Sequence, residues 1–189
     1  FLKRLVVGGF DRVFEIGRNF RNEGIDKSHN PEFTGLEAYQ AYADYNDMAD
    51  LFSDMIPYVA EKVLGTKVIT IGEEEVDLSK GFVRKSIIDL IKEYAGIDLL
   101  STEDLAEAKA MAKSVGVDAD ECTCWGKVVQ EVFDEKVEPH LIQPTLVMDM
   151  PRDISPLAKT HRDNPRLVEH FDAYIGGMEI GCAYSELSN

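Results

Sequence analysis

The chain has 189 residues and a mass of 21.2 kDa, which suits one sizeable hydrophobic core and is too short for two full domains. Its 20 Lys and Arg residues are outnumbered by 35 Asp and Glu residues, giving a net charge of −15 and a pI near 4.6. This acidity argues against nucleic acid as a ligand of the whole surface, and a hydrophobic share of 44% excludes a disordered acidic chain.

The negative charge is spread unevenly along the chain. Residues 31–140 carry a net charge of −14, residues 141–150 one of −1, and residues 171–189 one of −3. Residues 1–30 are net positive by two and residues 151–170 by one. Two short basic segments therefore stand in a very acidic chain.

Neither a membrane span nor a secretory leader is visible in the sequence. No apolar run approaches the ~18–20 residues needed to cross a bilayer, and the opening FLKRLVVGGF lacks the apolar core of a signal peptide. The three cysteines, Cys122, Cys124 and Cys182, cannot all be paired in disulfides within the chain. The C-T-C motif at residues 122–124 is not matched by a second pair of Cys or His residues that would complete a four-ligand metal site. We expect free structural thiols in a soluble, cytoplasmic protein.

The first elements predicted form a long-looped antiparallel hairpin. Residues 12–23 alternate, with Phe14, Ile16 and Phe20 on one face, and residues 33–45 alternate again. Between them, residues 24–31 are rich in turn-forming residues. The two strands should therefore pair through this loop.

The middle of the chain is predicted to be mainly helical. Apolar spacing of three and four predicts a helix from Asn46 to Gly65, capped by Asn46 or Asp47. A small hairpin about Gly72 and three helices are predicted next, the second of them capped by Ser101 or Thr102. The three helices span residues 84–95, 102–115 and 124–137. We interpret residues of about 65–140 as a mainly helical insertion with solvated outer faces.

Strand patterns return at the end of the chain. Residues 145–150 alternate, a loop with Pro151 and Pro156 follows, and 168–175 with 178–187 suggest a hairpin about Gly176-Gly177. Strands joined by hairpins, without regular alternation with helices, predict an α+β fold with an antiparallel β-sheet flanked by helices.

The common phosphate and hydrolase motifs are absent. The chain contains no GxGxxG, no GxxxxGK[ST] and no GxSxG, and its four histidines lack zincin spacing. What remains is polar residues grouped on two hairpins. They are Arg21, Glu23, His29, Glu37 and Tyr39 on the first hairpin, and Asp172, Glu179, Cys182, Tyr184 and Glu186 on the last.

The side chains on the two hairpins include groups that bind anions and groups that bind metal cations. A guanidinium such as Arg21 binds phosphate or carboxylate with two hydrogen bonds, and His29 is placed to meet outer phosphates. Asp172 and Glu179 could share Mg²⁺, which prefers oxygen ligands. The alternative interpretation is a set of surface cross-strand ion pairs.

Four segments closely resemble class II lysyl-tRNA synthetases. FRNEGIDKSHNPEFTGLEAY (20–39) matches their motif 2, and QAYADYNDM (40–48), ISPLAK (154–159) and GGMEIGCAYSEL (176–187) continue the resemblance over essentially the whole chain. The fold implied is an antiparallel sheet flanked by helices. The function implied is ATP-dependent activation of lysine to lysyl-adenylate and its transfer to tRNA(Lys), by a cytoplasmic homodimer.

The resemblance implies an ATP site. Arg21 would be the catalytic residue, gripping the ATP α-phosphate and the lysine carboxylate, while Glu23 would bind the adenine amino group. His29 and Asn30 would contact ATP at the end of the motif 2 loop, and Phe33 would stack on adenine. Two further residues, Asp172 and Glu179, would hold Mg²⁺ beside the ATP.

The resemblance also implies a lysine pocket. Tyr39 and Glu186 would receive the ε-ammonium, because a buried ammonium needs a carboxylate partner. The whole pocket would consist of Glu37, Tyr39, Cys182, Tyr184 and Glu186.

The chain departs from the family pattern in three respects. Cys182 stands where the family usually has Asn contacting the substrate carboxylate, and a thiol is a weak donor. Asp172 stands where Glu is more common. Motif 1, motif 3 and the N-terminal anticodon-binding barrel are missing, and both ends look cut, so we expect residues 1–189 to be a partial catalytic domain that is inactive or severely impaired alone.

Two alternatives to a tRNA ligase remain. One is a paralogue on the same fold that lysylates a translation factor, which should lack the nucleic-acid-binding barrel upstream. The other is a non-catalytic regulator that binds lysine or adenylate without turnover, an interpretation that Cys182 favours.

Overall fold

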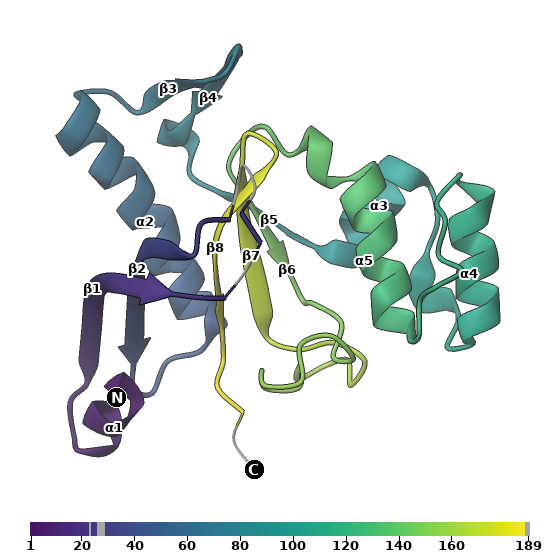
Figure 1. The fold of residues 1–189 in the computed structure, drawn as a ribbon, viewed down its shortest axis with the longest axis horizontal. Coiled ribbons are helices and arrows are strands. Elements are labelled where there is room, and N and C mark those ends of the chain that lie inside the picture. The colour runs from purple at the N-terminus through teal and green to yellow at the C-terminus, as the bar shows by residue number, and fades with distance from the viewer. Residues whose placement is uncertain (23, 26–28, 188–189) are drawn as a thin grey trace. The chain divides into compact units, whose positions relative to one another are not determined.

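A computed structural model describes residues 1–22, 24–25 and 29–187 in two compact units, residues 1–43 and 44–189 (Figure 1). Each unit is described separately below. None of the helices within these described residues combines the length and apolar character needed to span a membrane.

The first unit is the predicted hairpin. A short helix α1 (Leu2–Val7) precedes β1 (Arg12–Phe20), which pairs antiparallel with β2 (Glu32–Gln40). Gly17 lies opposite Gly35 in the register. The second strand ends before Tyr45, where we predicted its end, because Tyr42 adopts a left-handed backbone conformation with φ 56°.

The second unit opens with helix α2 (Tyr45–Leu64), which ends at Gly65 as predicted. The predicted cap is wrong: Asp44 caps the helix, accepting a hydrogen bond from Asn46 N while its own amide donates to Asp47 Oδ2, both at 2.8 Å. This reciprocal capping box satisfies two amide groups at the helix start. Helix α4 (Leu105–Ser114) is also capped elsewhere than predicted, at Asp104.

A four-stranded sheet forms the centre of this unit. Its strand order is β5 (Val83–Ser86), β6 (Thr145–Met148), β7 (His170–Ile175) and β8 (Met178–Tyr184). The last three strands pair antiparallel, which confirms the predicted antiparallel-dominated α+β sheet, whereas β5 pairs parallel to β6. The predicted helix start at residue 84 is therefore wrong.

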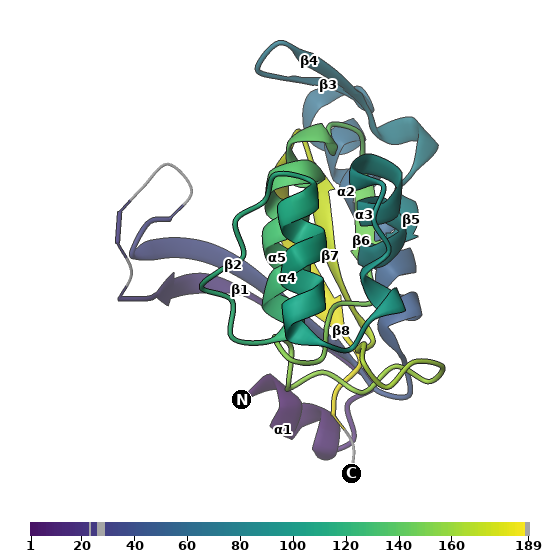
Figure 2. The same ribbon diagram turned by 90° about the vertical axis from the view of Figure 1, so that its right-hand side faces the viewer.

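The remaining elements surround this sheet. They are the hairpin β3 (Val68–Ile71) and β4 (Glu74–Asp77), the helices α3 (Ile87–Ala95), α4 (Leu105–Ser114) and α5 (Trp125–Lys136), and the 3₁₀ turns η1 (Leu78–Lys80), η2 (Leu99–Ser101) and η3 (Glu138–His140). Figure 2 shows α3 and α5 beside β6 and β7.

Helices cover both faces of the sheet. Val147 and Tyr174 pack with α3 and α5 in the main core, which includes the fully buried Phe133. Phe171 and Ala173 lie on the opposite face and pack with α2. The region interpreted as a solvated insertion thus also supplies much of the core, and strands β6 and β7 lie between two helical layers.

Candidate active site

On the first hairpin, the structure brings two of the predicted ATP-binding residues together. The guanidinium carbon of Arg21 lies 5.4 Å from the centre of the half-buried Phe33 ring. Arg21 N also donates to Pro31 O at 2.9 Å, which closes the base of the loop. A guanidinium group beside an aromatic ring can bind a phosphate while the ring stacks on a purine.

Two of the predicted lysine-binding residues also meet on β2. Glu37 and Tyr39 are two residues apart, and the Tyr39 hydroxyl donates to Glu37 Oε2 at 3.4 Å. The Lys3 ammonium lies 5.8 Å from the centre of the Tyr39 ring. A phenol ring beside a carboxylate is therefore able to accommodate an alkylammonium group.

The loop between these strands holds the other predicted ATP contacts. His29 and Asn30 are exposed at its second end. Glu23, predicted to bind the adenine amino group, lies outside the described residues. Its role stays a prediction.

In the second unit, β7 and β8 bring Asp172 and Cys182 directly opposite each other. Sequence analysis missed a third residue at this point: His170 Nε2 lies 3.1 Å from Asp172 Oδ1, and its ring contacts the Tyr184 ring edge-on at 5.6 Å. The signal was available, because His170 and Asp172 are two apart on a strand that pairs with the strand of Cys182.

The electrostatics of this cluster favour a cation. Burial lowers the pKa of His170, but the Asp172 carboxylate and the Cys182 sulfur outweigh it and raise that pKa to about 9. Burial, followed by the charge of Asp172, raises the pKa of Glu179. A divalent cation held by Asp172 and Glu179 would relieve this repulsion, so their oxygen donors fit Mg²⁺.

Backbone pairing fixes the segment just after β8, where Glu186 lies. Ala158 forms a bridge pair with Glu186, and Lys159 N donates to Ser185 O at 2.9 Å. Ser185 N in turn donates to Glu169 O at 2.9 Å. The ISPLAK segment and residues 185–187 are thus adjacent, although about 30 residues separate them in the sequence.

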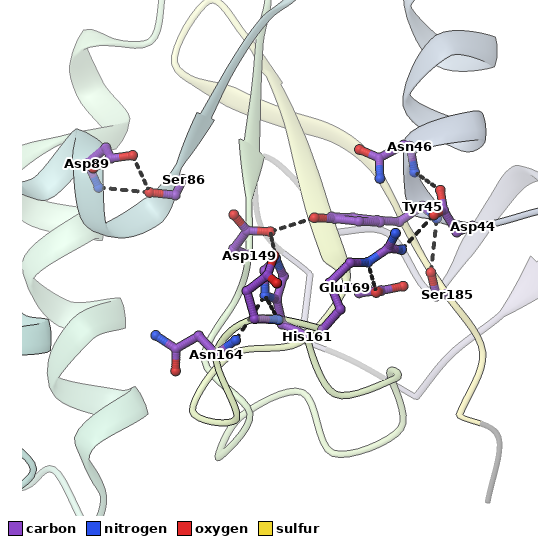
Figure 3. A network of polar contacts seen from close by, with 12 residues as sticks. Asp44, Tyr45, Asn46, Ser86, Asp89, Asp149, His161, Asn164, Glu169 and Ser185 are labelled. Carbon is purple, nitrogen blue, oxygen red and sulfur yellow. Dashed lines mark hydrogen bonds and ion pairs between the residues drawn. The ribbon is translucent and has the colours of Figure 1, made fainter.

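A partly buried polar network that sequence analysis missed lies beside this segment (Figure 3). Arg162 joins the fully buried Glu169 through Nε at 2.8 Å and Asp44 through a terminal nitrogen at 2.6 Å. Tyr45 donates its hydroxyl hydrogen to Asp149 Oδ1 at 2.8 Å. Both contacts tie the start of α2 to segments more than 100 residues later.

His161 completes this network. Its Nδ1 accepts from the amides of Asp163 and Asn164 at 3.1 and 3.3 Å, so the neutral ring carries its hydrogen on Nε2, which lies 3.5 Å from Asp149 Oδ1. Burial raises the pKa of Asp149, and burial together with Asp149 raises the pKa of Tyr45.

Comparison with known proteins places these residues in a family. A model of the family described as "tRNA synthetases class II (D, K and N)" matches residues 1–189. The lysine–tRNA ligase of Trichormus variabilis is 53% identical over all of the chain and 34% of its own length, and that of Carboxydothermus hydrogenoformans is 50% identical over all of the chain and 39% of its own.

The heat-inducible lysine–tRNA ligase of Escherichia coli K12 is 46% identical, again over all of the chain and 38% of its own length. The chain thus spans 34–39% of the length of these curated relatives. Because the family model covers every residue, the chain belongs to the class II tRNA synthetases of the D, K and N group.

Proposed function

We propose that the protein containing this chain activates lysine with ATP to lysyl-adenylate and transfers it to tRNA(Lys) in the cytoplasm, acting as a homodimer. One observation carries the proposal: the chain is 46–53% identical, along its whole length, to relatives named lysine–tRNA ligase. Residues 1–189 would supply the part of the catalytic domain from motif 2 to just before motif 3.

The proposed chemistry needs charge neutralisation and alignment. The lysine carboxylate attacks the α-phosphorus in line and pyrophosphate leaves, so two anions must be brought together without a covalent enzyme intermediate. We assign Arg21 to bridge both anions and Phe33 to stack on adenine, which their proximity at 5.4 Å supports. Glu23, His29 and Asn30 would make the other ATP contacts.

Asp172 and Glu179 are proposed to hold Mg²⁺. The bound ion would neutralise charge on the phosphate oxygens. The raised pKa of Glu179, caused by burial and then by the charge of Asp172, supports this assignment, because a bound cation would favour the ionised form of both carboxylates.

Lysine selection is assigned to Glu37, Tyr39, Cys182, Tyr184 and Glu186. The hydrogen bond between Tyr39 and Glu37 and the Lys3 ammonium near the Tyr39 ring support this assignment. We assign the ε-ammonium to Glu186 and Tyr39, since an ammonium that leaves water needs a carboxylate.

ATP–pyrophosphate exchange on the full-length protein with lysine, ornithine and arginine tests the proposal. We expect a strong lysine preference, because one missing methylene already costs roughly 10- to 200-fold in a fitted pocket. Comparable exchange with ornithine or arginine would contradict the assigned pocket. Lysine binding without exchange would instead establish a non-catalytic regulator.

The same assay, performed on residues 1–189 alone, tests whether this chain is only part of the catalytic domain. Residues 1–189 alone should be inactive or severely impaired in lysine-dependent exchange. Robust exchange by this chain alone would refute that expectation.

Glu186→Gln tests the specificity residue. The substitution keeps the size of the side chain and removes its charge, so we expect the KM for lysine to rise roughly 100-fold. The KM for ATP should change little. Steady-state exchange kinetics measure both, and Glu74→Gln, an exposed position on β4, is the matched control. Equal effects on both KM values would count against this role.

A further inference from the structure

Strands β7 and β8 place three different metal-ligating side chains together. His170 and Asp172 share one face of β7, and Cys182 is the register partner of Asp172 on β8. The His nitrogen, the carboxylate oxygen and the sulfur all lie within 4.8 Å of one another. In the described part of the chain, no other set of three His, Cys, Asp or Glu side chains converges in this way.

We propose that His170, Asp172 and Cys182 form a binding site for a divalent transition metal of the zinc class. The inference is independent of lysine activation: it concerns which metal these three side chains bind, whatever reaction the protein performs.

The imidazole is already oriented as a ligand. Its Nδ1 lies 3.1 Å from Ser155 Oγ, within the ISPLAK segment. When Nδ1 carries the hydrogen and donates it to Ser155, the lone pair of Nε2 points at Asp172 and Cys182. Nε2 is buried and faces Asp172 Oδ1 at 3.1 Å, so a metal ion would take the place of the proton between them. Hydrogen bonding of the second ring nitrogen is typical of metal-bound histidines.

The spacing is close to that of a tetrahedral zinc site. Zn–N and Zn–O bonds near 2.0–2.1 Å and Zn–S bonds near 2.3 Å imply ligand separations of about 3.3–3.6 Å. The observed range, from 3.1 Å for the His–Asp pair up to at most 4.8 Å, requires a contraction of about 1 Å at the widest pair. Cys182 is exposed, so its side chain is able to make this adjustment.

The donor chemistry decides the metal class. Imidazole nitrogen and thiolate sulfur favour zinc-like ions, whereas Mg²⁺ keeps oxygen ligands and water. Three protein ligands leave a fourth position open for water or another oxygen. As the metal binds, the thiol of Cys182 and the imidazolium of His170, whose pKa is raised to about 9, each release a proton to solvent, so binding should weaken as pH falls.

Asp172 would be shared with the proposed Mg²⁺ site. Zinc at His170, Asp172 and Cys182 should therefore exclude a magnesium ion held through Asp172. This competition makes the two metal assignments separable by experiment.

Cobalt(II) is the probe, because ligation by sulfur gives a thiolate-to-cobalt charge-transfer band in the near ultraviolet. We expect the wild-type protein to develop this band to a one-to-one endpoint, to lose it on addition of Zn²⁺, and to keep it in a large excess of Mg²⁺. Absence of the band, or its removal by Mg²⁺ as readily as by Zn²⁺, would overturn the proposal.

Four variants locate the site. Cys182→Ser should abolish the band, while Cys124→Ser, which removes a thiol elsewhere in the unit, should leave it unchanged. Ser155→Ala should weaken cobalt binding roughly 10- to 100-fold while the band keeps its shape, because the imidazole loses its orienting partner. His161 also faces an aspartate, Asp149, but no cysteine takes part in that contact. His161→Asn should therefore leave cobalt binding unchanged.

Circular dichroism checks that each variant is folded. A band that persists in folded Cys182→Ser protein would place the thiolate elsewhere and overturn the assignment. If Cys182→Ser does not fold, Ser155→Ala decides: unchanged cobalt affinity in that variant would equally overturn it.

Discussion

At the residue scale, Asp149 combines backbone strain with a buried charge. Its φ of 64° places a non-glycine residue in the left-handed region, where Asp and Asn are the better-tolerated side chains. The Tyr45 hydroxyl donates to its carboxylate, and His161 faces the same oxygen. Burial nevertheless raises its pKa above the ordinary 3.8, so the ionised form is disfavoured in the folded state.

This shift makes stability depend on pH. Between its ordinary pKa and its raised folded-state pKa, Asp149 is protonated in the folded chain and ionised in the unfolded chain. Its contribution to stability is therefore complete below pH 3.8 and is lost as pH rises through the folded-state pKa.

Asp149→Asn should remove this dependence. Asn keeps an acceptor for Tyr45 and tolerates the left-handed backbone, but it does not ionise. We expect the free energy of unfolding of the variant, relative to wild type, to increase from about pH 4 to about pH 7 in urea titrations. Asp163→Asn, in an exposed loop, is the control. A difference that stays constant or falls with pH would contradict the assigned cause.

Residue roles were only partly predictable from the sequence. Motif-like residues such as Arg21 and Phe33 were found because they stand in one continuous segment, and the structure places them together. His170 was missed although its spacing of two from Asp172 on a predicted strand was visible, because its place beside Cys182 depends on the β7–β8 register. The Asp149 network was missed because it joins residues 104 positions apart.

At the element scale, local patterns predicted hairpins better than strand pairing between distant segments. Both the first hairpin and the last were predicted, because each turn lies between its own strands. Strand β5 was misread as helix, since residues 83–86 run directly into α3 and pair with a strand about 60 residues later. Parallel pairing of this kind leaves no local signal in the sequence.

Arg162 connects elements in the same nonlocal way. It reaches Asp44 at the start of α2 and Glu169 just before β7. The Glu169 side chain is only 1% exposed, so its charge depends on this partner. Arg84 contacts Asp50 at 2.6 Å, a length similar to the 2.8 Å between Arg162 and Glu169, but the Asp50 carboxylate is 72% exposed.

Arg162→Ala and Arg84→Ala therefore form a matched pair. Loss of Arg84 should cost at most about 0–1 kcal/mol, because water solvates the Asp50 carboxylate that remains. Loss of Arg162 should cost clearly more, since it leaves a buried carboxylate without its cation. Urea unfolding at neutral pH measures both variants. Equal destabilisation would mean that burial of Glu169 does not decide the strength of the contact.

At the scale of the whole molecule, the uneven charge is the dominant feature. The net charge of −15 includes −14 within residues 31–140, and −8 of this falls within residues 65–140, which also supply much of the core. Opposing pairs such as Lys92 with Asp98 at 3.1 Å are exposed and offset little of this. The two basic segments contain Arg21, His29 and the ISPLAK segment, so positive charge is concentrated where the proposed ATP contacts lie.

Self-repulsion of this kind should make the folded chain more stable in salt. Like charges lie closer together in the compact state than in the unfolded chain, so screening favours folding. Raising sodium chloride from about 0.01 M to about 0.15 M shortens the Debye length from about 30 Å to about 8 Å, and we expect the free energy of unfolding to rise. Choline chloride should act alike, because screening depends on ionic strength. Stabilisation by sodium alone would indicate a bound cation, and a fall in stability would show that attractive pairs outweigh the repulsion.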